Sequence, residues 1–560
     1  MLKVVGASWL QTRISTYILV AVALLGIGAI ILGEFGHVED DGTYSATVSW
    51  NHKGGYHIDF WGQSNDLASV RLNVARAYYK TSIFESGWSI IEIETSSKYP
   101  DTVQAYAAGL LEGSLTWQLI HHHWHNTVNV VCEKRADECR KLMRFLRENT
   151  AVIRERAELL EATDPFWHMV RLFYIQLDGL EAGWRFAVRR SRQTVEMDTE
   201  HFLWLAMAAD LPDLELAPNV TDYTKGMVCL KNFLRNEQEP LIAIGHTTAA
   251  PYAKMLRLLK KYTFGYHVLP TFNTVALTPG RSIVMSSYPG ALSSHDEFYL
   301  IHGENRELNV AGIPLTVTHE RELWNFTKVK DQQVMSSVKI MAANRLATDS
   351  HTWFRVMLLQ NGNDAARQWI TLEPRSRIVG LIEQLSGIIR VMDISEQFAA
   401  TGAFCYTGKA RLREIKVELG ENGTDDEDDD DVTRDKLATR LQRNITTIES
   451  FRRLLQGCSH KDTVATTAIT VTEDGDQTAQ ILAYRGDLEE NGNASPFGVI
   501  DAKIMLAGVD GVESFEATSG PSTLGFRKPF RWSNTFPNVS HIGQPDVFEF
   551  DNVIPLWVWV

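Results

Sequence analysis

The chain has few cysteines, no excess of basic residues and little sign of disorder. Five cysteines in 560 residues are too few for a disulfide-dense scaffold. Lysine and arginine total 55 against 69 aspartates and glutamates, which gives a net charge of −14. Because nucleic-acid binding requires a basic surface, this charge argues against a nucleic-acid partner. The 44% apolar content excludes a largely disordered chain, and the length allows more than one core-forming unit.

Three familiar catalytic signatures are also absent. The segment Gly520–Leu524 (GPSTL) lacks the final glycine of a G-x-S-x-G nucleophile elbow. His319 and Glu320 are followed by Arg-Glu-Leu, so they do not form a zinc-binding H-E-x-x-H motif. Gly402–Lys409 has the wrong spacing for a phosphate-binding loop and no Ser or Thr after its lysine. We therefore expect no cofactor.

Four histidines are clustered at His121, His122, His123 and His125. On a helix, His121 and His125 share a face, as two zinc ligands would. No acid or cysteine lies at a local spacing that completes such a site. We interpret the cluster as a polar helix face and expect no metal.

One long apolar run is present, the 17 uncharged residues from Tyr17 to Gly33. Lys3 and Arg13 precede it and acids follow it from Glu34, which is typical of a segment engaged by the secretory machinery. This pattern predicts a cytosolic N-terminus over 1–14 and a signal peptide or a membrane anchor over 15–34. An uncleaved segment would contact the membrane.

Six N-x-S/T sequons agree with export of the remaining chain. They stand at Asn219, Asn325, Asn422, Asn444, Asn493 and Asn538. We expect a glycoprotein that is secreted, lysosomal or membrane-anchored with its body in the lumen. In that oxidising space Cys132 and Cys139 are close enough to form a disulfide, whereas Cys405 and Cys458 are expected to be uncommitted thiols.

The patterning divides the chain into a helix-rich part over 35–223 and a strand-rich part over 224–560. Apolar residues recur at helical spacing from about residue 101, and short alternating runs separated by Gly, Pro and Asn follow Pro218. Thr274–Thr278 and Ser282–Ser287 are among the expected strands, and Ser336–Leu346 is an expected helix. Runs of helices beside runs of strands predict an α+β fold in which both parts pack as one unit. Seven consecutive acids at 425–431 predict an exposed insertion over 418–435.

Eleven stretches resemble the phospholipase B-like family, and its lamina ancestor branch in particular. They run in order along nearly the whole chain, so together they are more specific than any one alone. The stretches are MLKVVGASW, YAAGLLEGSLTW, SSYPG, DEFY, ANRLATDSHTW, RQWITL, EQLSG, YRGDL, FGVIDAKI, FRWS and GQPDVFEF. The resemblance implies a four-layer αββα sandwich of the N-terminal-nucleophile hydrolase type.

The resemblance also implies a mechanism. The precursor cleaves itself ahead of a cysteine, whose α-amino group then serves as the base for the new thiol nucleophile. When Lys231 is aligned with the family lysine, Gly226 falls on the nucleophile, and glycine has no side chain. Two replacements stay open besides loss of self-processing. Thr224 is two residues upstream and keeps the face of the strand, whereas Cys229 is three downstream and turns to the opposite face.

Three further positions match family motifs. His246 is retained at the end of the strand that follows the Gly226–Lys231 strand. Asn344 is a candidate for holding an oxyanion, and Arg485 is a candidate for fixing an anionic head group. Ordinary hydrogen bonding within the fold is the alternative role for Asn344 and Arg485. The family resemblance implies a lipid hydrolase acting on acyl esters or amides of phospholipids. The alternative is an inactive relative that binds a lipid or a protein partner.

Overall fold

The structure is a computed structural model. It describes residues 17–18, 20, 42–53, 55–62, 67–211, 226–235, 239–270, 276–304, 306–316, 332–359, 365–420, 430–443, 445–457, 480–489, 493–524 and 527–559. The chain divides into two units, Met1–Gly42 and Thr43–Val560. In the described part of the chain, no helix has both the length and the apolar character needed to cross a membrane. Most of the predicted signal or anchor segment, 15–34, lies outside the described residues.

The larger of two main sheets has eleven strands in the order β13-β12-β11-β10-β9-β8-β7-β4-β3-β1-β2. Strands β7 to β13 pair with their neighbours in antiparallel fashion, whereas β4 and β7 are parallel. The strands are β1 Gly42–Asn51, β2 Gly55–Gly62, β3 Ala75–Thr81, β4 Ser89–Thr95, β7 Leu258–Thr263, β8 Ser282–Ser287, β9 Phe298–Gly303, β10 Arg306–Pro314, β11 Arg367–Glu373, β12 Ile378–Leu385 and β13 Ile388–Asp393.

The smaller sheet has five antiparallel strands in the order β14-β5-β6-β15-β16. They are β5 Met227–Arg235, β6 Glu239–Pro251, β14 Ala403–Tyr406, β15 Phe497–Gly508 and β16 Gly511–Ser519. A short pair, β17 Phe530–Arg531 and β18 Val547–Phe548, lies apart from both sheets.

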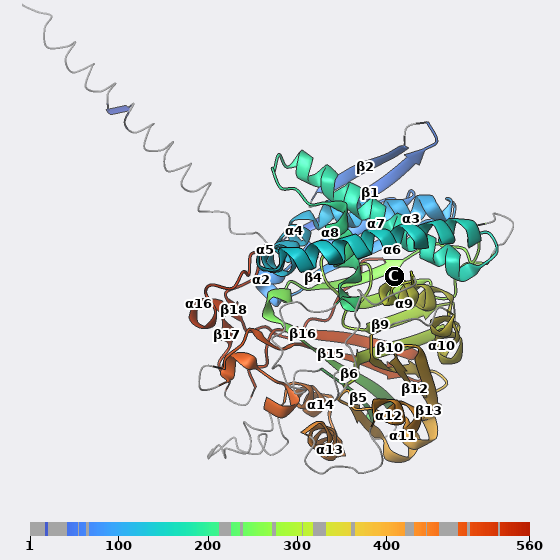
Figure 1. Ribbon diagram of the computed structural model, residues 1–560, viewed down its shortest axis with the longest axis vertical. Coiled ribbons are helices and arrows are strands. Elements are labelled where there is room, and N and C mark those ends of the chain that lie inside the picture. Colours follow the sequence, from blue (N-terminus) through green and yellow to red (C-terminus); the bar gives the residue numbers. More distant parts are fainter. Residues whose placement is uncertain are drawn as a thin grey trace, which may run out of the picture. The chain divides into compact units, whose positions relative to one another are not determined.

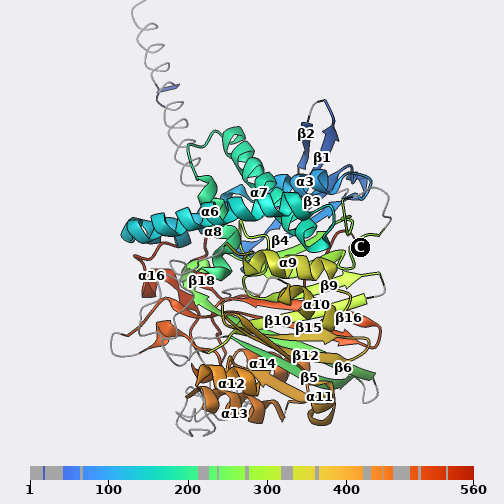
Figure 2. The same ribbon diagram turned by 45° about the vertical axis from the view of Figure 1, so that its right-hand side comes forward.

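Helices cover the outer faces of the two sheets (Figures 1 and 2). One set covers the larger sheet, and α13 Asp430–Arg443 with α14 Ile448–Leu455 covers the smaller one. The set on the larger sheet comprises α3 Asp101–Leu115, α4 Trp117–Trp124, the π-helix η2 His125–Asn129, α5 Val130–Lys134, α6 Ala136–Leu160, α7 Pro165–Arg190, α8 Thr199–Met207, α9 Ser336–Leu346 and α10 Ser350–Leu358. Unit Thr43–Val560 is therefore layered as helices, sheet, sheet and helices.

Alternating side chains explain why the strands stack this way. In β9, Tyr299 and Ile301 pack with the helices, whereas Phe298 and Leu300 point into the core between the sheets. In β5, Val228 and Leu230 join the core between the sheets, and Cys229 turns to the helices α13 and α14. Since both faces of these strands are buried, each sheet needs a layer on either side.

The predicted α+β class is correct, and the predicted segments Ser282–Ser287 and Ser336–Leu346 coincide with β8 and α9. Two expectations differ from the structure. Leu277, in the predicted strand 274–278, makes only an isolated bridge with His267. The predicted acidic loop 418–435 is helical at both ends, because α12 Arg413–Leu419 and α13 extend into it. Within α13, Asp435 is buried and accepts a hydrogen bond from Thr407, so this acid is part of the core.

Candidate functional site

Gly226 lies at the start of β5, buried against the neighbouring strand β6. Met227, the first residue of β5, pairs with Thr247, and its amide donates to the Thr247 hydroxyl at 2.9 Å. A Cβ atom added at Gly226 would lie 1.8 Å from the Thr247 carbonyl oxygen and 3.4 Å from the Cα of Thr248. The backbones approach too closely for any side chain at the position that the resemblance assigns to the nucleophile.

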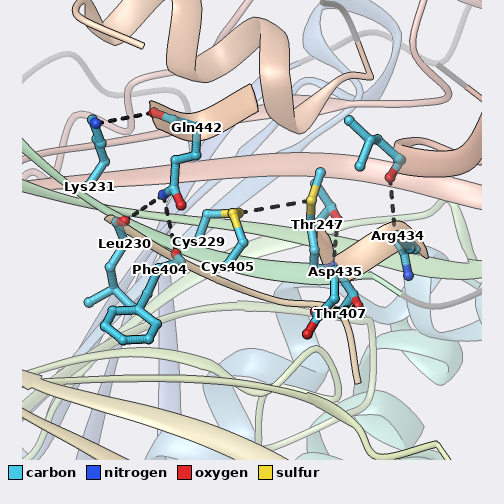
Figure 3. The surroundings of a disulfide bond; sticks show 12 residues. Cys229, Leu230, Lys231, Thr247, Phe404, Cys405, Thr407, Arg434, Asp435 and Gln442 are labelled. Carbon is cyan, nitrogen blue, oxygen red and sulfur yellow. Dashed lines mark hydrogen bonds between the residues drawn. A yellow bond between two sulfur atoms is a disulfide. The ribbon is translucent and has the colours of Figure 1, made fainter. Parts of the chain in front are cut away.

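Cys229, one of the two proposed replacements, is bonded to Cys405 on the neighbouring strand β14 (Figure 3). The two residues face each other in the antiparallel β5–β14 pair, with their Cα atoms 4.1 Å apart. Gln442 of α13 holds the same two strands by donating to the carbonyls of Leu230 at 2.5 Å and Phe404 at 3.2 Å. Two expectations are corrected, since Cys229 has no free thiol to act as a nucleophile and Cys405 is not uncommitted.

His246 lies on β6 opposite Val228 and points into the core between the sheets. Its Nε2 donates to the carbonyl of Gly312 on β10 at 2.8 Å, so Nε2 carries the proton of the neutral ring. Among the described residues, no group hydrogen-bonds to Nδ1. Burial, reinforced by the nearby Lys503 ammonium, lowers the pKa of His246 to about 3. This histidine is a weak base near neutral pH.

Beside His246, four charged side chains form a buried cluster, which consists of Arg257, Asp296, Asp501 and Lys503. Arg257 contacts both carboxylates, at 2.7 Å for Asp501, and Lys503 lies 2.9 Å from Asp501 and 3.3 Å from Asp296. All four side chains are fully buried. Burial opposes ionisation, but Arg257 and Lys503 together hold the pKa of Asp296 below its ordinary value. Two cations and two anions compensate each other, as buried charges require.

The cluster is tied to the start of β5 through Thr248. Lys503 donates to the Thr248 hydroxyl at 2.7 Å, and the Thr248 amide donates to Asp501 at 3.0 Å. The Cα of Thr248 would also lie 3.4 Å from a Cβ atom at residue 226. The position of the missing nucleophile, the buried charges and His246 therefore belong to one region.

Thr248 also lines a cavity of about 230 Å³. The cavity lies between the helical layer, which supplies His123 and Trp204, and the end of β6. Lys254, Tyr288 and Arg367 line it as well. A site that includes a cavity and lies next to the nucleophile position is a candidate for ligand binding.

Asn344 and Arg485 do not line this cavity. Asn344 is buried in α9, and its side-chain oxygen accepts a hydrogen bond from Trp353 at 2.8 Å within the helical layer. Arg485 pairs with Asp487 and donates to the carbonyls of Ser522 at 3.0 Å and Lys528 at 2.7 Å. In the structure both side chains make the internal hydrogen bonds that were their alternative role.

The structure describes some of the remaining predicted positions. Cys132 and Cys139 are joined by a disulfide between α5 and α6, and Asn493 and Asn538 are exposed. The described residues contain no group of three or more His, Cys, Asp or Glu side chains arranged to hold a metal ion. The positions outside the described residues are Thr224, Asn219, Asn325, Asn422, Asn444 and Cys458.

The buried charges were missed as site residues, although three of them lie in the stretches that carry the family resemblance. DEFY contains Asp296, and FGVIDAKI contains Asp501 and Lys503. SSYPG supplies Ser286 and Tyr288, which donate to Asp296 at 2.7 and 2.8 Å. The available signal was a charged residue inside an otherwise apolar strand, since such a charge must meet a partner within the core.

A layered α+β protein with an enclosed polar site and a neighbouring cavity is the class that this geometry defines. Comparison with known proteins specifies the family. The model of the Phospholipase B family matches residues 75–555. The chain is 30% identical to the phospholipase B-like protein lamina ancestor of Drosophila melanogaster over 100% of both chains. It is also 30% identical to phospholipase B-like 2 of Homo sapiens over 86% of both chains.

This chain belongs to the phospholipase B family. Among solved structures, it has a TM-score of 0.27 and 11% identity to a Caenorhabditis elegans N-acylethanolamine-hydrolyzing acid amidase ortholog, covering 50% of this chain and 92% of that one. A similarity this low carries no argument about the site.

Proposed function

We propose that this chain is a phospholipase B-like protein that binds a lipid without hydrolysing it by the N-terminal-cysteine mechanism. The observation that carries the proposal is the contact between Gly226 and Thr247. A thiol at residue 226 would need a Cβ atom, and that atom would overlap the Thr247 carbonyl oxygen at 1.8 Å.

Two further observations support this proposal. The sulfur of Cys229 is bonded to Cys405, so the nearest cysteine is not a thiolate. His246, with its pKa lowered to about 3, accepts protons poorly at neutral pH, whereas a general base works best when its pKa lies near the working pH. A cavity lined largely by apolar side chains stays available for binding.

We also propose that the fold is of the N-terminal-nucleophile hydrolase type. Its support is the resemblance together with the order of layers, in which two stacked and mainly antiparallel sheets lie between helices. Loss of the nucleophile would leave this architecture unchanged, because a fold can persist without its chemistry.

Hydrolysis of acyl esters or amides is the second candidate, and its support is the family itself. It would need another nucleophile, for which Thr224 is the candidate because it is two residues from Gly226. Self-processing ahead of Thr224 would create a new N-terminus with a hydroxyl nucleophile and an adjacent amine.

Two measurements together distinguish the lipid-binding protein from the hydrolase: the N-termini of the purified chain and its hydrolytic activity. We would purify the full chain, determine its N-termini by sequencing, and measure acyl release from phosphatidylcholine and from an N-acyl amide. We expect no N-terminus between residues 212 and 229 and no release above the buffer rate. A new N-terminus at Thr224, with activity that disappears in Thr224→Ala, would overturn the proposal.

We further propose that the body is exported and glycosylated. The support is a pair of disulfides, which form in oxidising compartments, and the exposure of the sequon residues Asn493 and Asn538. In a secretory host, Asn493→Gln and Asn538→Gln should each remove one glycan from the mass of the protein. Unchanged masses in both variants would contradict glycosylation at these sites.

A further inference from the structure

The cavity beside Thr248 is small for the ligands of this family's name. Its volume is about 230 Å³, below the roughly 300–1,000 Å³ of sites that enclose a drug-sized ligand. It is also far larger than the roughly 30 Å³ of a water molecule. A complete phospholipid would not fit inside, but a head group or a short hydrocarbon chain would.

The charged side chains that line the cavity are positive. Lys254 and Arg367 line it, and no aspartate or glutamate occurs among its described lining residues. The four charges of the neighbouring cluster compensate each other, so they leave this asymmetry in place. An anion is therefore the charged group that the cavity favours.

The Arg367 side chain lines the cavity and is 7% exposed. Its Nη2 donates to the carbonyl of Ala209 at 2.5 Å. Its Nε lies 3.3 Å from a carboxylate oxygen of Glu297 but makes no hydrogen bond within the described residues. A guanidinium that lines a cavity suits a carboxylate or phosphate oxygen, because it presents its N–H donors in one plane.

Glu297, whose carboxylate lies 3.3 Å from Arg367, is only partly ionised near neutral pH. Burial raises the pKa of Glu297 to about 7, and Arg367 and Trp369 only partly oppose this effect. The carboxyls of Asp210 and Asp296 raise it further. Near neutral pH, Glu297 thus offsets only part of the positive charge on Arg367.

The remaining lining combines hydrocarbon with polar groups, which are the hydroxyls of Thr127, Thr248 and Tyr288 and the rings of His123 and His295. Val128, Val131, Trp204 and Leu205 form one side of the cavity. The Thr248 hydroxyl accepts from Lys503, which leaves its proton for a second hydrogen bond. Apolar walls beside two cations match a ligand with an anionic end and an apolar end.

We propose that this cavity binds an oxyanion carried on a hydrocarbon chain, a carboxylate or a phosphate monoester, with Arg367 and Lys254 pairing with the anion. The inference deepens the proposed function and rests on it for the choice of a lipid. The anionic head is held inside, and a chain longer than the cavity extends outward.

Calorimetric titration of the full chain tests this proposal with four probes, namely octanoate, octyl phosphate, octanol and inorganic phosphate. We expect octanoate and octyl phosphate to bind about tenfold more tightly than octanol, which lacks the charge, or inorganic phosphate, which lacks the hydrocarbon chain. Equal binding of octanoate and octanol would overturn the anion site but leave lipid binding intact. If inorganic phosphate bound as tightly as octyl phosphate, the hydrocarbon chain of the ligand would not contribute to binding, and this part of the proposal would be overturned.

Two variants locate the site. Lys254→Gln should weaken octanoate binding about tenfold, whereas the exposed control Lys53→Gln should leave it unchanged. Glu297→Gln at pH 8 should tighten binding, because it removes the negative charge beside Arg367, and a damaged fold would not produce a gain. Wild-type affinity in either Lys254→Gln or Glu297→Gln would overturn the proposal. Acyl release by the wild-type protein would contradict the proposed function, but it would leave the measured affinity for octanoate and octyl phosphate unchanged.

Discussion

Gly226 and Thr247 approach so closely that a Cβ atom on residue 226 would lie 1.8 Å from the Thr247 carbonyl oxygen. That oxygen belongs to β6, which also carries His246 and Thr248. Since a backbone oxygen cannot rotate away as a flexible side chain can, room for a side chain at residue 226 requires β6 to shift. Gly226 therefore allows the close approach of β6, and it also offers no side chain that could act as a nucleophile.

Replacing this glycine should destabilise the protein. We expect Gly226→Ala to lower the free energy of unfolding by about 1–3 kcal/mol or more, as overpacking does in a well-packed core. Gly420→Ala is a control with φ of +81° but no atom within 4 Å, so it should cost only the left-handed penalty of about 1–2 kcal/mol. Urea unfolding measures both, and a Gly226→Ala protein as stable as the wild type would show that β6 yields easily.

The two disulfides should differ in their contribution to stability. The Cys229–Cys405 bridge spans 176 residues and the Cys132–Cys139 bridge spans seven. Loop-closure entropy then gives about 5 kcal/mol for the first and about 2 kcal/mol for the second. Denaturant unfolding of the double variants Cys229→Ala/Cys405→Ala and Cys132→Ala/Cys139→Ala compares them. Equal losses would contradict the entropic account.

Acid should destabilise the fold through His246. Its pKa is about 3 in the folded protein, against about 6.5 in an unfolded chain, so the unfolded state binds the proton first. The resulting stability is present above pH 6.5 and is lost as pH falls from 6.5 towards 3. His295, whose pKa is also lowered to about 3, first by burial, adds to this loss.

Melting temperatures between pH 7 and pH 4 measure this effect. His246→Gln keeps a donor for the Gly312 carbonyl but cannot take up a proton, so its melting temperature should fall less steeply than that of the wild type. The exposed His52→Gln is the control and should follow the wild type. A His246→Gln profile parallel to the wild type would assign the acid sensitivity to other groups.

The buried charge cluster should be intolerant of losing one member. Lys503→Met leaves Asp296 and Asp501 with Arg257 as their one remaining cation in the cluster, and removing one partner of a buried pair costs about 3–5 kcal/mol. Adding Asp501→Asn should restore part of that stability by returning the cluster to zero net charge. Urea unfolding of the single and double variants measures the coupling, and additive losses would contradict it.

Some features of the site could be predicted from the sequence because they depend on local spacing. Counting residues along β5 placed Cys229 on the face opposite to Gly226, and in the structure it faces α13 and α14. Alignment of Lys231 with the family lysine singled out Gly226. Asn344 and Arg485 were chosen by motif alone, and their internal partners, Trp353 and Asp487, account for both side chains.

The residues alone predicted a layered α+β chain, because strand alternation and helical spacing are properties of neighbouring positions. The resemblance of its motifs to the phospholipase B-like family assigned Gly226, which has no side chain, to the nucleophile position. Only the tertiary structure decided that Cys229 pairs with Cys405, that Asp296 meets Lys503, and that a cavity with Arg367 and Lys254 opens beside Thr248. These groups are 176, 207 and up to 119 residues apart, because segments distant in the chain become neighbours when strands pair within a sheet and when the two sheets stack. Distances between such strands are fixed by packing, which no local pattern records.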